Sequence, residues 1–243
     1  MKKYWKIILW ILGVIFLILL IKFPIYKGEL MWRTVPLPLA GKTIVIDPGH
    51  GGPDGGAAAK DGTSEKEIAL QVAKITRDYL QQAGALVYLT REEDNDLAGE
   101  GYVRNRKSQD IRNRLKFIHE KEPDFFISIH LNALPSSRWS GAQTFFYASY
   151  PENKHLATMI QNEIIRNLEN TTRVPLQMNH VYLLKHAEVP GALVEIGFLS
   201  NEMEAKQLKD KVYQEQMSAS IYKGIIRYVT EEMEAENEME NTD

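Results

Sequence analysis

The stretch IVIDPGHGGPDGG, residues 44–56, leads from a strand-like apolar segment directly into a loop with five glycines and one histidine, His50. A strand followed by a glycine-rich loop is typical of α/β domains, where such loops bind phosphate groups or shape a site at the end of the sheet. His50 is therefore either incidental to a phosphate-binding loop or a metal ligand in a loop that needs glycine for its shape.

Strand-like and helix-like segments alternate along the rest of the chain. Expected strands lie at 43–47, 85–90, 124–130 and 141–148, with a further strand pair at 181–185 and 191–196. Expected helices run from a capping box formed by Ser64 and Glu67 to Gly84, and then over 108–120, 152–169 and 212–233. This order predicts a single α/β domain, with helices on both faces of a mixed, mostly parallel sheet.

Three side chains are expected to meet at one end of this sheet, where open α/β sheets bind their ligands. His50 follows the strand at 43–47, and His130 ends the strand at 124–130. Glu65 begins the helix after the glycine loop, which carries it back toward His50. Two imidazoles and one carboxylate, with a fourth position open to water, are a typical catalytic zinc set. The alternative for Glu65 is a carboxylate that only stabilises the helix dipole.

The phosphate-binding interpretation fits the same loop less well. A Walker loop needs Lys followed by Ser or Thr at the helix start, and none is present here. A dinucleotide fingerprint needs G-x-G-x-x-G, whereas this loop spells G-x-G-x-x-x-G and its helix begins nine residues further on. The sequence therefore disfavours nucleotide binding.

Glu195 is the candidate for acid–base chemistry, because it ends an apolar strand within PGALVEIGFLSN. A buried ion without a partner costs several kcal/mol, so such a carboxylate usually faces a metal, a base or a cavity. Its alternative role is structural, in an ion pair with Arg112 or Arg114.

Among the remaining histidines, His180 and His186 flank an expected strand and could line the crevice.

His119 and His155 fall in expected helices and are interpreted as surface or packing residues.

Composition restricts the chemistry further. The 243 residues include no cysteine, so a metal must be held by His, Asp or Glu. The formal net charge of −3 gives no reason to expect nucleic acid as a partner. With 44% hydrophobic residues, the chain suits one globular domain plus additional segments.

The N-terminus predicts a transmembrane anchor at residues 1–23, followed by a linker at 24–41. Lysines at 2, 3 and 6 precede an uncharged apolar run from Ile7 to Ile21. At ~1.5 Å per residue this run covers about 22 Å of a hydrocarbon core of about 30 Å, and the flanking lysines can reach the headgroups. A cleaved signal peptide is the alternative, but no small-residue cleavage site follows. The leading lysines favour a single-pass protein with a cytoplasmic N-terminus and an extracytoplasmic domain.

The acidic segment at 231–243 is expected to be a solvated, frayed tail. This leaves residues 42–230 for the catalytic domain.

Four motifs, IDPGHGG, EKE, SIHLNA and VEIGFLSN, occur in the order and spacing seen in zinc-dependent N-acetylmuramoyl-L-alanine amidases of the Amidase_3 type. The resemblance covers about residues 42–230. It implies hydrolysis of the amide between N-acetylmuramic acid and the first L-alanine of peptidoglycan. The short N-terminal anchor, WSGAQTFFY and NLENTTR are similar to the sporulation and germination amidases, which act on spore cortex as a step toward muramic δ-lactam.

The resemblance implies one Zn²⁺ per chain, with His50, Glu65 and His130 as its ligands and Glu195 as the catalytic glutamate. Glu65 is preferred over Glu67 because the family's ligand is the one before the lysine, and Asn132 matches an asparagine with a supporting role. No long helical insertion separates His130 from Glu195, so regulation is expected from timing, substrate delivery or an unidentified activating protein partner.

Two other classes of protein fit parts of this pattern. A zinc peptidase that cleaves within the peptidoglycan stem peptide needs the same metal and glutamate. A non-catalytic, membrane-tethered wall binder would need neither.

Overall fold

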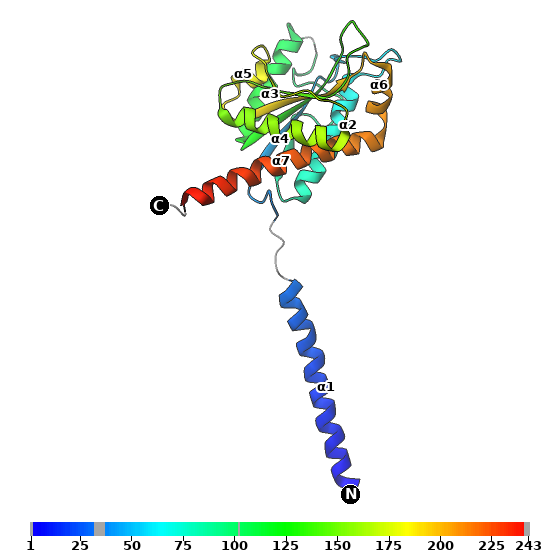
Figure 1. Cartoon of the computed structure of the whole chain (residues 1–243), viewed down its shortest axis with the longest axis vertical. Coiled ribbons are helices and arrows are strands. Elements are labelled where there is room, and N and C mark those ends of the chain that lie inside the picture. Colours follow the sequence, from blue (N-terminus) through cyan, green and yellow to red (C-terminus); the bar gives the residue numbers. More distant parts are fainter. Residues whose placement is uncertain (1, 32–36, 102, 241–243) are drawn as a thin grey trace. The chain divides into compact units, whose positions relative to one another are not determined.

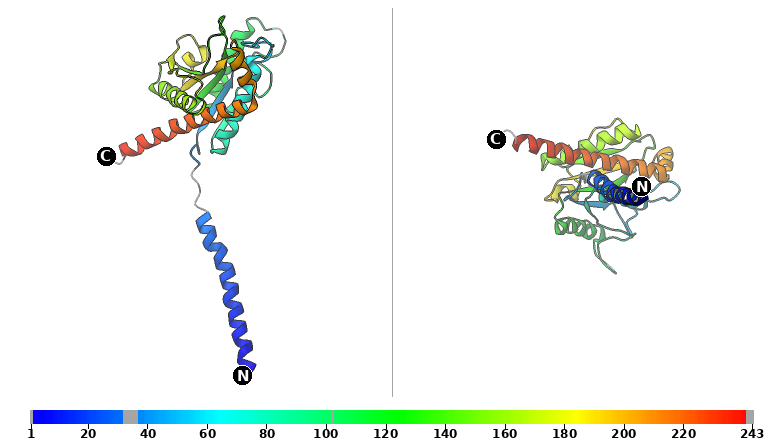
Figure 2. Two further views of the ribbon diagram at one scale, coloured as in Figure 1. Left: turned by 45° about the vertical axis from the view of Figure 1, so that its right-hand side comes forward. Right: turned by 90° about the horizontal axis from the view of Figure 1, so that it is seen from below.

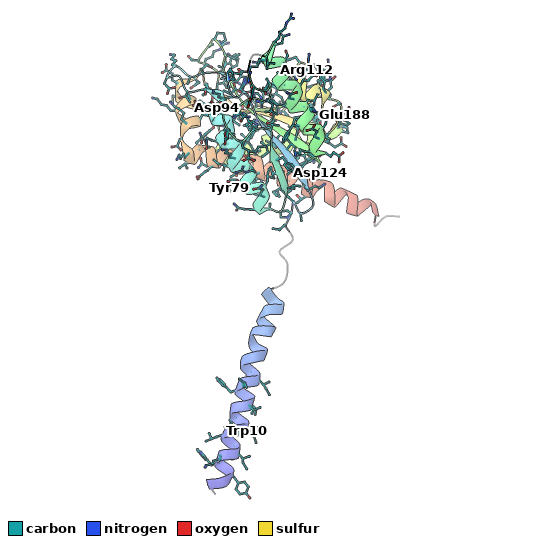
Figure 3. The ribbon with its side chains drawn as sticks, turned by 180° about the vertical axis from the view of Figure 1, so that it is seen from behind. Trp10, Tyr79, Asp94, Arg112, Asp124 and Glu188 are labelled. Carbon is teal, nitrogen blue, oxygen red and sulfur yellow. The ribbon has the colours of Figure 1, made fainter. Side chains whose placement is uncertain are left out.

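The computed structural model describes residues 2–31, 37–101 and 103–240, and the chain divides into two compact units between Leu37 and Pro38. The first unit contains helix α1 (Lys2–Met31). Its apolar side chains are exposed along residues 4–19, and Trp10, which projects from the helix in Figure 3, is 73% exposed.

None of the helices within the described residues has both the length and the apolar character that a membrane span requires. The transmembrane segment thus stays a prediction. α1 continues to Met31, so the first part of the expected linker at 24–41 is helical. Residues 32–36 of that linker lie outside the described residues.

The second unit is built on one six-stranded sheet with the order β2-β1-β3-β6-β4-β5. Its strands are β1 (Thr43–Pro48), β2 (Leu86–Leu89), β3 (Phe125–Asn132), β4 (Gln143–Phe146), β5 (Leu176–Gln177) and β6 (Gly191–Phe198). Four neighbouring pairs are parallel, and only β4 and β6 are antiparallel. The predicted mixed, mostly parallel sheet is confirmed.

Helices cover both faces of this sheet (Figures 1 and 2). They are α2 (Glu65–Gln82), α3 (Arg106–Lys121), α4 (Pro151–Leu168), α5 (Tyr182–His186), α6 (Glu202–Lys209) and α7 (Lys211–Glu240). Because successive residues of a strand point to opposite faces, each central strand supplies two cores. In β1, Ile44 and Ile46 pack into the core that includes α2, α4 and α7, whereas Val45 packs with α3 and α5.

The strand predicted at 181–185 is wrong, because these residues form helix α5 instead. Leu183 and Leu184 are consecutive and both pack into the same core, beside Phe126 and Phe145. A strand would point these two leucines to opposite faces, whereas a helix can bury both. β4 pairs with β6 and, on its other side, with the short β5, which the sequence did not reveal.

The C-terminal region also differs from expectation. Residues 202–209 form the separate helix α6, and α7 extends to Glu240, so most of the predicted frayed tail is helical. Glutamate, alanine and methionine are good helix formers, which accounts for the continuation. Residues 241–243 lie outside the described residues.

The predicted capping box at the start of α2 is wrong as well. Ser64 is the N-cap residue, but within the described chain its hydroxyl has no hydrogen-bond partner. The first turn of α2 is fixed instead by the backbone and by Glu65. Glu65 N donates to Ala57 O at 2.8 Å, and Ala57 N donates to Glu65 Oε2 at 2.7 Å. This reciprocal pair ties the glycine loop to the helix start.

Candidate metal centre and active site

The three predicted ligands come together in space from three separate segments. His50 lies in the loop after β1, Glu65 begins α2, and His130 lies near the end of β3. One potential ligand atom from each residue lies within 4.8 Å of the others. His50 and His130 are partly exposed to a cleft, whereas Glu65 is only 2% exposed.

Glu65 bridges the two histidines. Its Oε1 is 2.9 Å from His130 Nδ1, and its Oε2 is 3.2 Å from His50 Nε2. Leu131 N also donates to Oε1, at 2.9 Å. Burial alone would raise the pKa of this carboxyl, but its interactions with both histidines hold the pKa well below its ordinary value. The carboxylate is therefore ionised and aimed at the two imidazoles.

The glycines of the loop make room for these rings. A Cβ on Gly49 would come within 2.4 Å of the His130 ring. A Cβ on Gly56, where φ is +69°, would lie 2.5 Å from Glu65 Oε2 and 2.6 Å from the His50 ring. Thus the space beside these glycines is filled by the candidate ligands themselves. The glycines of this loop therefore make room for a cluster of side chains and not for a phosphate.

Asp54 contacts His50 from the side away from Glu65, with Oδ2 at 2.9 Å from Nδ1. Burial would lower the pKa of His50, but its interactions with Glu65 and Asp54 raise it above the ordinary value. Sequence reasoning did not single out Asp54, although its position four residues after His50 in a tight loop could have suggested the contact.

Glu195 lies directly beside His130, because the two residues are paired in register between β3 and β6. Its Oε2 is enclosed and has no hydrogen-bond partner among the described residues. Burial raises the pKa of Glu195 to about 7, with the nearby Glu65 also raising it and the two histidines opposing. The structural alternative for Glu195 is not supported, since Arg114 pairs with Asp47 at 2.8 Å and with Asp110 at 2.9 Å.

Two buried arginines hold the backbone on which His50 sits. Arg114 donates to Pro48 O at 2.7 Å and to His50 O. Arg91 donates to Pro48 O at 3.1 Å and to Gly49 O at 2.9 Å. These contacts support a loop in which His50 itself adopts the left-handed conformation, with φ of 59°. Their importance was not evident from the sequence, because both arginines are distant in the chain.

A cleft of about 590 Å³ opens beside these groups, on the α3 and α5 side of the sheet. His50, His130, Asn132 and Glu195 lie along it, as does His180. Apolar side chains also line it, namely Ile111, Met178, Val181, Leu183 and Leu193. The cleft thus combines the candidate reactive groups with apolar surface.

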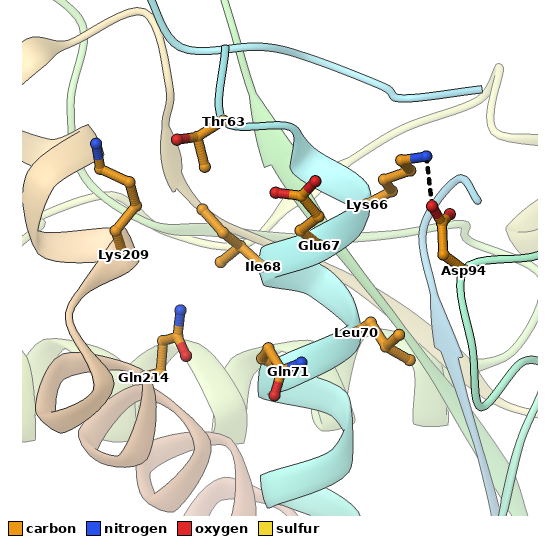
Figure 4. Close-up of a pocket in the computed structure, with 9 residues that line it drawn as sticks. All are labelled: Thr63, Lys66, Glu67, Ile68, Leu70, Gln71, Asp94, Lys209 and Gln214. Atoms are coloured by element: carbon orange, nitrogen blue, oxygen red, sulfur yellow. Dashed lines mark hydrogen bonds and ion pairs between the residues drawn. The ribbon is translucent and has the colours of Figure 1, made fainter. Parts of the chain in front are cut away.

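The other histidines have ordinary packing roles. His186 stacks on Tyr182 with ring centroids 4.4 Å apart, and His119 accepts a hydrogen bond from Glu188 N. His155 packs against Tyr228. A second pocket, between α2 and the start of α7, is lined by polar side chains, by Ile68 and Leu70, and by the Lys66–Asp94 ion pair (Figure 4).

The sequence matches the family model described as N-acetylmuramoyl-L-alanine amidase over residues 44–227. The chain belongs to this amidase family. It is 50% identical over 234 residues to the germination-specific N-acetylmuramoyl-L-alanine amidase of Bacillus subtilis (strain 168), a match that covers 95% of this chain and 98% of that protein.

Solved structures agree with this assignment. The CwlD amidase from Clostridioides difficile, solved in complex with the GerS lipoprotein, is 40% identical with a TM-score of 0.76, and the match covers 78% of this chain and 99% of that one. The amidase AmiC2 of Nostoc punctiforme is 29% identical with a TM-score of 0.68, covering 79% and 99%. The chain is thus an N-acetylmuramoyl-L-alanine amidase, an enzyme of peptidoglycan hydrolysis, and this favours the first of the three protein classes considered from the sequence.

The environment of Glu195 predicts a pH-dependent gain in stability for Glu195→Gln. With an ordinary pKa of 4.5 unfolded and about 7 folded, the folded state holds an extra proton between these values, so stability falls as pH rises through that window. Relative to the wild type, the free energy of unfolding of metal-free Glu195→Gln should therefore rise from pH 4.5 to 7. We expect this difference to reach about 3 kcal/mol at most. Chemical denaturation in EDTA at several pH values measures the difference.

The matched control is Glu67→Gln, which replaces an exposed carboxyl. A difference between wild type and Glu195→Gln that stayed constant from pH 4.5 to 7.5 would contradict the buried, proton-binding environment of Glu195.

Proposed function

We propose that the chain is a zinc-dependent amidase in which His50, Glu65 and His130 hold one Zn²⁺ and Glu195 is the catalytic acid–base. One observation carries this proposal. Three ligand atoms lie within 4.8 Å of one another, beside an enclosed carboxyl oxygen that has no hydrogen-bond partner in the described part of the chain. Such an oxygen is expected where a proton is exchanged with a substrate or with water.

The donor set fits zinc. His50 offers Nε2, because its Nδ1 faces Asp54, while His130 offers Nδ1 and Glu65 an oxygen. Two imidazole nitrogens and one carboxylate are one of the ligand sets that catalytic zinc sites use. The glycines at 49 and 56 keep this space free of other side chains.

The residues of the chain then have distinct tasks in hydrolysis of the N-acetylmuramoyl–L-alanine amide. A zinc ion at this site would polarise the amide carbonyl and lower the pKa of water. Glu195 accepts a proton from the attacking water and returns it to the nitrogen of the departing L-alanine. A raised pKa suits this exchange, since the group must both take up and release a proton near neutral pH.

Glutamate substitutions separate metal binding from catalysis. We expect Glu195→Gln to retain zinc and to lose turnover on purified peptidoglycan by roughly 100-fold or more, because proton transfer is lost. Glu65→Gln should lose zinc as well as activity, since a neutral amide is a poor ligand for this cation. Metal analysis after dialysis and release of soluble stem peptides measure the two properties.

Glu67→Gln is the control, because Glu67 is exposed in the same helical turn and should leave both properties unchanged. Full turnover by Glu195→Gln would show that another group acts as the base. Products that result from cleavage inside the stem peptide, in place of free stems beginning with L-alanine, would favour the peptidase.

We further propose that the enzyme acts on spore cortex, as a step toward muramic δ-lactam, from an extracytoplasmic position on the membrane. The name of the 50% identical Bacillus subtilis relative supports a germination-related role. Exposed Tyr4, Trp5 and Trp10, together with Lys6, suit an N-terminal segment at a membrane surface. The GerS complex of the Clostridioides difficile relative supports a protein partner for this chain too.

Spores of a strain that lacks this protein test the cortex role and the anchor together. We expect δ-lactam in the cortex muropeptides to be restored by the full chain but not by Glu195→Gln. A chain without residues 2–23 should leave the membrane fraction and restore less δ-lactam, because it is no longer held near its substrate.

Normal δ-lactam in the strain that lacks the protein would contradict the cortex role. Unchanged membrane fractionation of the shortened chain would contradict the anchor.

A further inference from the structure

Asp54 is held rigidly beside the candidate metal centre by its own loop. Its Oδ1 accepts a hydrogen bond from Gly56 N at 3.1 Å. Its backbone pairs with that of Gly51 in both directions, with N–O distances of 2.9 and 3.1 Å. Hydrogen bonds within the loop itself therefore hold the carboxyl group in place.

This position determines which nitrogen of His50 faces Glu65. A carboxylate only accepts hydrogen bonds, so at 2.9 Å from Asp54 the Nδ1 of His50 must carry the proton. With its proton held on Nδ1, His50 can offer a lone pair to a cation only from Nε2, which is 3.2 Å from Glu65. Asp54 thus selects the tautomer that can bind a cation at the centre.

His50 needs such a partner more than His130 does. His130 is part of β3, where strand pairing and the close packing of its ring on Gly49 fix its orientation. His50 lies outside any strand, in a left-handed backbone conformation. Arg114 holds its carbonyl oxygen, but this contact is to the backbone and does not reach the ring.

We propose that Asp54 is a positioning residue of the metal centre, which fixes the ring and the tautomer of His50 so that Nε2 is presented to zinc. This inference rests on the proposed zinc site. Lys107 also approaches Asp54 Oδ2, at 3.1 Å, but its side chain is 65% exposed. Exposed ion pairs contribute little, so we assign the orienting effect to the Asp54–His50 contact.

Zinc affinity is the direct test, measured on the full metal-free chain by competition with a chromophoric chelator. Loss of a carboxylate that orients a histidine ligand typically weakens metal affinity by roughly 10–100-fold, and we expect this loss for Asp54→Ala. Asp54→Asn should lose less, because its amide oxygen still accepts the Nδ1 proton. His50→Ala provides the reference for loss of a ligand.

Asp94→Ala is the matched control. Asp94 accepts from Gly52 N of the same loop at 2.9 Å and pairs with Lys66 at 2.7 Å (Figure 4), as Asp54 accepts from Gly56 N and pairs with Lys107. It makes these contacts without touching His50 as far as the described residues show. Zinc affinity of Asp94→Ala should equal that of the wild type, even if thermal unfolding of the metal-free protein shows a similar loss of stability for both alanine variants.

The outcomes distinguish a failure of the positioning role of Asp54 from a failure of the proposed zinc site. If the wild type binds zinc and His50→Ala does not, but Asp54→Ala binds as the wild type does, the positioning role is wrong and the proposed site stands. If Asp94→Ala weakens zinc as much as Asp54→Ala, the effect is loop destabilisation and the positioning role is again wrong. If His50→Ala binds zinc as tightly as the wild type, the proposed site itself fails.

Discussion

The candidate site depends on one buried carboxylate. Glu65 is almost inaccessible to solvent, yet it accepts backbone hydrogen bonds from Ala57 and Leu131 and contacts both histidines. A buried carboxylate is stabilised by such partners, and removing one member of a buried ion pair costs several kcal/mol. The same requirement that stabilises Glu65 therefore brings the glycine loop, helix α2 and strand β3 to one point.

The sheet provides the rest of the geometry. Parallel pairing of β1 with β3 brings the loop after β1 beside the end of β3, and pairing of β3 with β6 puts Glu195 next to His130. Arg114 reinforces this arrangement through Asp47. Burial raises the pKa of Asp47, but Arg114 together with hydrogen bonds from Thr90 and Ser128 lowers it to about 2. Buried ion pairs of Arg114 with Asp47 and Asp110 thus lie under the loop that carries His50, where precise placement matters most.

The sequence predicted the parallel sheet and the convergence of the three candidate ligands because both follow from local patterns. Apolar strands, glycine-rich loops and the carboxyl-end rule place side chains without knowledge of distant contacts. It did not predict α5, since a short apolar run such as VYLLK fits either a helix or a strand, and only the shared core of Leu183 and Leu184 decides. Asp54 and the two loop-binding arginines were missed for a related reason, because their roles depend on tertiary distances.

The central claim is that this cluster holds a single zinc ion. Anomalous diffraction recorded on either side of the zinc absorption edge, from crystals of protein purified without added metal, tests it most directly. The account predicts one zinc peak per chain, at about 2.0–2.2 Å from His50 Nε2, His130 Nδ1 and a Glu65 oxygen. An active enzyme whose zinc peak lies elsewhere, or whose crystals show none, would contradict the account.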